Sequence, residues 1–279
     1  MKPRFFVSLS DPGSRTVAPG LVVDLAESDA RHGRTVLRSR SGDPCELVFS
    51  DPPVLADGVF EEVGRRVSAR VTAVRAADAR RALLLLVQAL SQPRKVDEVI
   101  EKGTEVGFDS FLVMPSAASP AMPHEKLEVR SVRWRTIAGE AAKQSRQPAV
   151  PEVRTASSLA AALELTQAER WSSVVLTPEA PDHLADVLAA EVRGTRELHG
   201  GPAGGGDAVE GAVAGPGAVA GSVGRWALWV GPEGGWSAEE LEVLRAAGAR
   251  SAGLGSRILR TETAGPVAGA LARYALSDW

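Results

Sequence analysis

Apolar residues change their spacing along the chain near residue 80. Before this point, short apolar or alternating runs that are typical of strands occupy residues 4–9, 45–51 and 67–74. Turn-forming clusters of Asp, Pro and Gly separate these runs at residues 11–13, 42–44 and 51–53. One short helix is expected over residues 28–38. Strands at this spacing with little helix predict a small β-barrel.

After residue 80, strand-length apolar runs alternate with helical patterns. The apolar runs stand at residues 83–90, 111–115, 172–176 and 226–230. Helices are expected over residues 94–107, 126–146 and 183–192, after Ser237, and from about Thr261. This alternation predicts an α/β domain built on a mostly parallel sheet. Because the boundary is expected near residues 75–82, we divide the chain into a first domain over 1–76 and a second over 77–279.

The segment 194–224 follows neither pattern. Roughly one-third of it is glycine, and it contains hardly any large apolar side chain. Burial therefore cannot offset the entropy that ordering would cost. We expect a flexible insertion without a catalytic role.

The composition limits the possible classes of function. Cys45 is the only cysteine, which excludes an internal disulfide and a cysteine-rich zinc cage and favours a reducing cytoplasm. The four histidines show no metal-ligand spacing, so no metal is expected. The first apolar run ends before Asp11 and is too short for a signal peptide or a membrane span. We therefore expect a cytoplasmic protein with no membrane partner.

The net charge of −3 hides an uneven distribution of charged residues. Residues 1–151 carry 22 Lys and Arg against 19 Asp and Glu, whereas residues 152–279 carry 10 against 16. Of the 32 basic residues 27 are Arg, a side chain that suits bidentate contact with phosphate. Enrichment in Arg, Ala and Gly also fits a coding bias, so charge alone does not establish nucleic-acid binding.

Three loops rich in glycine or proline follow apolar strands in the second half of the chain. They are LTPEAPD (176–182), GPEGGW (231–236) and GLGSRILRTETAG (253–265). Ser237 and Glu240 form an S-x-x-E capping box that begins a helix after the second loop. Loops at the carboxyl ends of parallel strands bind ligands in α/β folds, although glycine also serves ordinary tight turns. The residues alone leave a phosphate, a dinucleotide, a folded methyl donor or no ligand as alternatives.

Two nucleotide sites are disfavoured by details of these loops. The second loop lacks the Gly-Lys-Ser/Thr ending of a P-loop, which disfavours ATP. The third loop has Ile258 where a dinucleotide fingerprint needs its third glycine, and it lies at the end of the domain. A nicotinamide-dependent dehydrogenase is therefore the weakest alternative.

Several motifs together resemble one family. GPEGGWSAEE followed by GLGSRILRTETAG is similar to the SPOUT superfamily, and in particular to the bacterial small-subunit ribosomal RNA (uridine-N3)-methyltransferases. PRFFV near the start, HGRTVLR with a following GD, KVDEVIEKGTEVG and the RW...EAAKQSR helix occur in the order of that family. The chain departs from the family at residues 116–122, where SAASPAM stands in place of a Ser-Glu-Arg-Ser segment.

The resemblance implies an RNA-binding PUA-like β-barrel over residues 1–76, followed by a SPOUT domain with a deep trefoil knot. In this family the knot loops hold S-adenosylmethionine in a bent shape, where glycine lets the backbone approach the ligand closely. The positions of this chain that match donor-binding positions are Leu176, Thr177, Pro178, Gly231, Pro232, Glu233, Gly234, Leu254, Gly255, Ser256, Ile258, Leu259, Arg260, Thr263 and Ala264.

The resemblance also implies methylation of N3 of a specific uridine in the small-subunit (16S) ribosomal RNA. Because N3 of uracil must lose its proton before it is a good nucleophile, a base or an anion-stabilising group is needed. Arg260 is expected to stabilise the developing charge, and Glu262 to accept the proton. Glu140, Gln144 and Arg146, on one stripe of the helix 126–146, are further catalytic candidates.

The expected partners are ribosomal RNA and a second copy of the chain. The RNA would be free small-subunit RNA or the assembled small subunit, and the resemblance implies a homodimer. The expected phosphate contacts are Arg4, Arg31, Arg34, Arg38, Lys95 and Lys102. Two other functions remain open: another SPOUT RNA methyltransferase that modifies a ribose 2′-O or a transfer-RNA base, and a non-catalytic RNA-binding factor in ribosome assembly.

Overall fold

The computed structural model describes residues 2–7, 16–50, 53–63, 66–75, 82–190 and 224–276. Contacts within the chain divide it into two compact units. The first unit comprises Met1–Ala79 with Gly139–Val150, and the second comprises Arg80–Ala138 with Pro151–Trp279. The first unit thus includes the end of the helix that was expected over residues 126–146. The whole of this helix was expected in the second domain. The expected insertion lies outside the described residues except for Gly224, which begins a strand.

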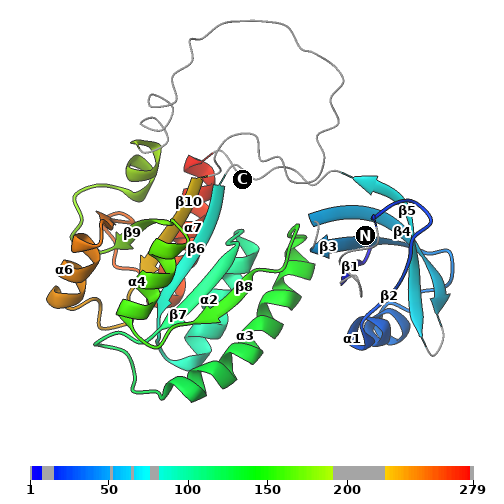
Figure 1. Ribbon diagram of the computed structural model, residues 1–279, viewed down its shortest axis with the longest axis horizontal. Helices are drawn as coiled ribbons and strands as arrows, with labels where there is room; N and C mark the ends of the chain where they lie inside the picture. The colour runs from blue at the N-terminus through cyan, green and yellow to red at the C-terminus, as the bar shows by residue number, and fades with distance from the viewer. Residues whose placement is uncertain are drawn as a thin grey trace, which may run out of the picture. The chain divides into compact units, whose positions relative to one another are not determined.

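The first unit is built on a five-stranded sheet (Figure 1). In sheet order its strands are β1 (Arg4–Val7), β3 (Pro44–Ser50), β4 (Pro53–Val63), β5 (Val67–Arg75) and β2 (Val22–Asp24). β1 is parallel to β3, and the other neighbours are antiparallel. Phe5 and Phe60 pack edge to face inside this sheet, with ring centroids 5.7 Å apart.

Three features of the first unit differ from the sequence predictions, of which the first is the short strand β2, which was not predicted. β4 was not predicted, because its sequence PVLADGVFEEV mixes acidic residues with apolar ones and its pairing with β5 shifts register at Asp57/Gly58. A side chain at Gly58 would lie 3.0 Å from the carbonyl of Arg70, so the close approach of the strands requires glycine here. The helix expected over 28–38 is instead a short α-helix, α1 (Glu27–Arg31), continued by a π-helix, η1 (His32–Val36).

The second unit contains a six-stranded sheet in which all neighbouring strands are parallel. In sheet order the strands are β11 (Arg250–Ala252), β9 (Ser172–Leu176), β10 (Gly224–Val230), β6 (Ala82–Ala89), β7 (Ser110–Met114) and β8 (Glu152–Thr155). The predicted α/β class and mostly parallel sheet are confirmed for this unit. β8 and β11 were missed because strands of three or four residues are too short to show a periodicity.

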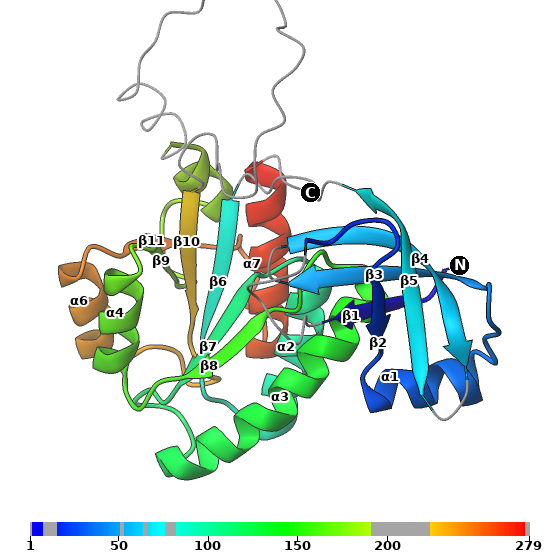
Figure 2. The ribbon, with the colours of Figure 1, turned by 45° about the vertical axis from the view of Figure 1, so that its right-hand side comes forward.

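Helices cover both faces of this sheet, as Figure 2 shows. One face packs against a helix over residues 184–190 and against α2 (Pro93–Glu105), α3 (His124–Ser145) and α7 (Thr261–Ala275). The other face packs against α4 (Leu159–Ala168) and α6 (Ala238–Ala246). Because both faces are buried, the central strands are apolar throughout, which is why the sequence showed them as continuous runs.

Local signals fix where these helices begin. The capping box before α6 is confirmed: the Ser237 hydroxyl accepts a hydrogen bond from the backbone N–H of Glu240, and the Glu240 carboxylate accepts one from the N–H of Ser237. Pro93 at the start of α2 occupies a helix position where a backbone N–H is not needed. No helix among the described residues is long and apolar enough to cross a membrane.

Candidate functional site

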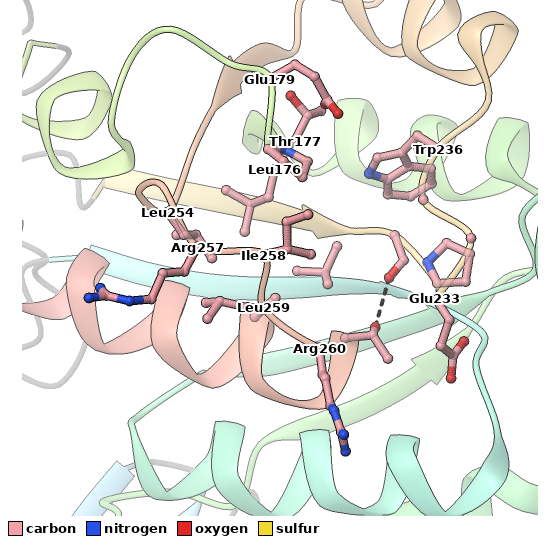
Figure 3. A pocket seen from close by; sticks show the side chains of 18 of the residues that line it. Leu176, Thr177, Glu179, Glu233, Trp236, Leu254, Arg257, Ile258, Leu259 and Arg260 are labelled. Atoms are coloured by element: carbon pink, nitrogen blue, oxygen red, sulfur yellow. Dashed lines mark hydrogen bonds between the residues drawn. The ribbon is translucent and has the colours of Figure 1, made fainter.

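Three loops of the second unit meet at one end of its sheet. They follow β9 at Leu176, β10 at Val230 and β11 at Ala252, and these three strands are neighbours in the order β11-β9-β10. Parallel strands end on the same edge, so the loops come together there. Between them lies a cavity of about 550 Å³, drawn in Figure 3.

Nearly all of the predicted donor-binding residues line this cavity. They are Leu176, Thr177, Pro178, Gly231, Pro232, Glu233, Gly234, Leu254, Gly255, Ile258, Leu259, Arg260 and Ala264. Ser256 and Thr263 do not line it and are exposed. Sequence reasoning missed other lining residues, among them Lys95, Glu179, Trp236, Arg257 and Thr261. The sequence could not assign Lys95 to the cavity, because this residue belongs to a helix that is far from the three loops in the sequence.

Backbone hydrogen bonds join the first and third loops. The N–H of Thr177 donates to the carbonyl of Ala252 at 3.0 Å, and the N–H of Gly253 donates to that of Asp182 at 2.8 Å. The N–H of Leu184 donates to Gly253 in turn at 3.0 Å. Ala252 and Gly253 are therefore fixed at both ends of the loop that follows β9.

A buried threonine joins the second loop to the third. The Thr261 hydroxyl donates to the carbonyl of Gly231 at 2.8 Å and accepts a hydrogen bond from the Gln88 side-chain amide at 3.1 Å. Gln88 lies near the carboxyl end of β6 and is fully buried. The sheet thus supports both loops through one hydroxyl group.

Glycines allow close approaches around the cavity. Gly235 and Gly255 have φ values of +74° and +106°, which L side chains rarely adopt. A Cβ at Gly234 would lie 2.8 Å from the Cβ of Ala118. Ala118 belongs to the SAASPAM segment that departs from the family pattern, so this segment packs directly against the second loop.

Charged side chains gather at one rim of the cavity. In Figure 3, Leu176 and Leu254 lie in its interior, whereas Glu233 and Arg260 extend toward its edge. The Lys95 ammonium lies 3.0 Å from a Glu233 carboxylate oxygen and 3.5 Å from one of Glu262. The Arg260 guanidinium is 83% exposed and lies 3.9 Å from the other Glu262 oxygen. Two of the predicted catalytic residues, Arg260 and Glu262, are therefore adjacent.

The ion pair changes the acidity of both partners. The hydrogen bond with Glu233 raises the pKa of Lys95 above its ordinary value. Burial alone would raise the pKa of Glu233, but a hydrogen bond from its own backbone and the one from Lys95 keep it below its ordinary value. Both groups are charged at neutral pH. Lys95, which was expected to meet RNA phosphates, is instead paired with carboxylates at the cavity.

The other catalytic candidates, Glu140, Gln144 and Arg146, belong to the first unit by their contacts. Glu140 is largely exposed and pairs with Lys143 at 3.2 Å, and Gln144 is exposed. Arg146 donates to the carboxylate of Glu46. These three residues therefore belong to the first unit, whereas the cavity belongs to the second.

Glu46 is the centre of a buried charge cluster in the first unit. It is 4% exposed and accepts hydrogen bonds from Arg4 at 3.1 Å, from Arg75 at 2.7 Å and from Arg146. Burial alone would raise the pKa of Glu46, but hydrogen bonds from Arg75 and Arg4 and the charge of Arg146 lower it to about 2. Arg4, a predicted phosphate contact, is committed to this cluster rather than presented to solvent.

The remaining predicted phosphate contacts lie in different environments. Arg31 and Arg38 are exposed, and Arg34 is half-buried. Lys102 is half-exposed and pairs with Glu101 and Glu105 on its own helix, at 3.1 and 3.0 Å. Among the residues that the structure describes, no group of three His, Cys, Asp or Glu is arranged to hold a metal ion.

Comparisons with known proteins relate this architecture to RNA methyltransferases. A family model described as an RNA methyltransferase domain matches residues 80–273. The chain is 30% identical over 282 residues to the ribosomal RNA small subunit methyltransferase E of Mycobacterium bovis, an alignment that covers 99% of this chain and 92% of that protein.

Solved structures show the same fold. A ribosomal RNA small subunit methyltransferase E from Neisseria gonorrhoeae, bound to S-adenosyl methionine, matches with a TM-score of 0.74 and 24% identity over 98% of each chain. A Legionella pneumophila structure, also in complex with S-adenosylmethionine, matches with a TM-score of 0.72 and 22% identity over 99% of this chain and 98% of that one.

Proposed function

This chain belongs to the RNA methyltransferase domain family, and from that membership we propose that it transfers a methyl group from S-adenosylmethionine to N3 of a uridine in small-subunit ribosomal RNA. The observation that carries the proposal is the meeting of three strand-end loops on one cavity. The Mycobacterium bovis relative, which is 30% identical and aligns with 99% of this chain, bears the name of a methyltransferase of this RNA. The reaction would take place in the cytoplasm, where bacterial ribosomal RNA is made.

The cavity fits a donor of this kind in size and in lining. Its volume of about 550 Å³ lies within the range of roughly 300–1,000 Å³ that small-molecule sites occupy. Leu176 and Leu254 provide apolar walls, and Gly231, Gly234 and Gly255, which have no side chain, add backbone to the lining. These loop residues would hold the donor. When bound, it would supply the methyl carbon, and the electrons of the broken carbon–sulfur bond would stay on sulfur.

Arg260 and Glu262 are the residues that we assign to the acceptor. The proton leaves N3 for a carboxylate oxygen of Glu262, and the electron pair left on nitrogen forms the new bond to carbon. Glu262 is 14% exposed, so it is shielded from most solvent. The exposed Arg260 guanidinium stabilises the negative charge that develops on the uracil oxygens. Both residues stand at the start of α7, next to the cavity.

The first unit would bind the RNA. We propose that its five-stranded sheet is a PUA-like barrel that supports a phosphate-binding surface around α1 and η1. The exposed Arg31 and Arg38 and the half-buried Arg34 lie on or just after these helices. Such a surface would hold the RNA backbone without reading its sequence.

We also propose the trefoil knot and the homodimer of this family. The knot is supported by the backbone hydrogen bonds that fix Gly253 against Asp182 and Leu184, which place the last loop along an earlier one. The dimer is supported by two exposed apolar side chains, Ile258 at 86% beside the cavity and Tyr274 at 78% on α7. Sedimentation equilibrium would give the mass of two chains, and a monomer at all concentrations would reject the dimer.

The decisive test is to identify the modified atom. Unmodified small subunits and free small-subunit RNA are each incubated with the protein and labelled donor, and the product is digested and mapped by mass spectrometry. Label on uridine N3 supports the proposal. Label on a ribose 2′-O or on transfer RNA would make the chain another kind of RNA methyltransferase, and no label on any RNA would favour a non-catalytic assembly factor.

A further inference from the structure

Lys95 connects two carboxylates that come from different loops at the rim of the cavity. It lies in the first turn of α2, and its side chain is 25% exposed. Its ammonium group lies 3.0 Å from Glu233, on the loop after β10, and 3.5 Å from Glu262, in the first turn of α7. A single side chain thus joins three elements that are far apart in sequence.

We propose that Lys95 is a positioning residue that fixes the Glu262 carboxylate beside the acceptor base. The inference rests on the proposed function, since it assigns a task to Glu262 in proton transfer. Lys95 also lines the cavity, so donor affinity is measured beside the rate, but Lys95 itself would not touch the reacting atoms.

The surroundings of Glu262 explain why it needs a cation. One of its oxygens, Oε2, is buried and accepts no hydrogen bond from the described residues. The charged groups that face Glu262 are Lys95 from α2, Arg260 from the preceding loop, and Glu233, which shares Lys95 with it. Arg260 is 83% exposed, so solvent weakens its attraction, and Glu233 repels the carboxylate. Lys95 is therefore the better shielded of the two cations that hold the Glu262 carboxylate in place.

A phosphate contact is the alternative task for Lys95. Lys95, Arg260 and the carboxylates of Glu233 and Glu262 have no net charge together, so this group offers little attraction to an RNA phosphate. A phosphate would also have to displace Glu233 from a 3.0 Å hydrogen bond. The geometry therefore favours an internal role for Lys95 over the RNA contact expected from the sequence.

If Lys95 positions the proton acceptor, its loss should change how the methylation rate depends on pH. Glu262 can accept a proton only while it is ionised, so the rate falls at low pH as the carboxylate becomes protonated. Removal of a cation next to a carboxylate raises the pKa of that carboxylate. Loss of Lys95 should therefore move the acidic limb of the profile to higher pH, whereas an RNA contact would leave it in place.

The test uses Lys95→Met and Lys95→Arg in the full chain, with Lys126→Met as a matched lysine replacement on an exposed part of α3. Three quantities are measured: the single-turnover rate from pH 5.5 to 9, the Kd of the donor by calorimetry, and the salt dependence of RNA binding. We expect the acidic limb of Lys95→Met to lie at higher pH than that of wild type, with the rate at the acidic end of this range lowered about tenfold. Lys95→Arg should restore the limb, and donor Kd and salt dependence should stay within twofold of wild type.

Several results would overturn this role. An unmoved acidic limb with a smaller salt dependence of RNA binding would make Lys95 a phosphate contact. A loss of donor affinity equal to the loss of rate would make it part of the donor site, and no rescue by Lys95→Arg would indicate a merely structural effect. If the wild-type protein itself transfers no methyl group, the proposed function fails and the role of Lys95 fails with it.

Discussion

The hydroxyl of Thr261 lies 2.8 Å from the carbonyl oxygen of Gly231, to which it donates a hydrogen bond. Thr261 begins α7, whereas Gly231 follows β10, so one buried bond connects the last two loops of the cavity. Gln88 donates to the same hydroxyl from the sheet below. The relative placement of the two loops therefore depends on a group that does not need to touch a ligand.

Replacement of Thr261 by valine should weaken donor binding. The substitution keeps the shape of the side chain but leaves the Gly231 carbonyl without this donor and the Gln88 amide with only its bond to the Ala89 carbonyl, at a cost of about 1–2 kcal/mol. We expect the donor Kd to rise about tenfold in calorimetry. Thr261→Ser keeps the hydroxyl and is the control. Equal affinity of both variants would show that the bond does not organise the loops.

Arg260→Ala should separate catalysis from donor binding. The exposed guanidinium is assigned to the charge that develops on the acceptor base, and loss of one such group lowers the rate roughly 100-fold. Calorimetry should find donor binding largely intact, while single-turnover methylation slows. Arg245→Ala on α6 removes an exposed arginine away from the cavity and should leave both quantities unchanged. Parallel losses of affinity and rate in Arg260→Ala would contradict the assignment.

The double variant Arg31→Ala/Arg38→Ala should weaken RNA binding, because it removes two electrostatic contacts with phosphate. Each lost phosphate contact lowers the slope of log K against log salt by about 0.7–0.9, so the slope should fall by roughly 1.4–1.8. Lys102→Ala should have a smaller effect, because Glu101 and Glu105 already neutralise that ammonium group. Binding titrations at several salt concentrations measure the slopes. A slope equal to that of wild type would exclude Arg31 and Arg38 from the RNA interface.

Glu46 should make the stability of the first unit depend on pH in the acidic range. The pKa of this carboxyl is lowered from 4.5 to about 2 in the folded protein, so its contribution is fully present above about pH 4.5 and is lost as pH falls toward 2. The full contribution corresponds to roughly 3 kcal/mol.

The variant Glu46→Gln isolates this contribution. It leaves three guanidinium groups around a neutral side chain, so we expect a loss of about 3–5 kcal/mol near neutral pH. Urea unfolding of both proteins between pH 7 and pH 3 should show a difference that shrinks as the pH falls. A constant difference over this range would mean that Glu46 contributes packing rather than charge.

The sequence predicted the parts of the fold that carry strong local signals. The buried strands at 111–115 and 226–230 are apolar along their whole length, and the Ser237 capping box is complete within four residues. The three loops rich in glycine or proline were expected at strand ends, and the parallel sheet brings those ends together. Each of these predictions depended on residues that are close together in the chain.

What the sequence could not provide were contacts between distant residues. Lys95 and Arg4 looked like free basic side chains, because nothing in their own segments shows that Glu233 or Glu46 lies opposite. The end of α3 belongs to the first unit by contacts that helical periodicity does not encode. Short edge strands such as β11 form only because a neighbouring strand provides hydrogen-bond partners.

Direct binding of the donor tests the central claim that the three loops form its site. Equilibrium dialysis with labelled S-adenosylmethionine is carried out on the wild type, on Ala264→Leu, which places a larger side chain on the cavity wall, and on Ala270→Leu, the same change on α7 away from the cavity. We predict saturable binding of one donor per chain by the wild type and Ala270→Leu, and a Kd raised at least about tenfold in Ala264→Leu. No saturable binding by the wild type, or equal binding by all three proteins, would contradict the claim.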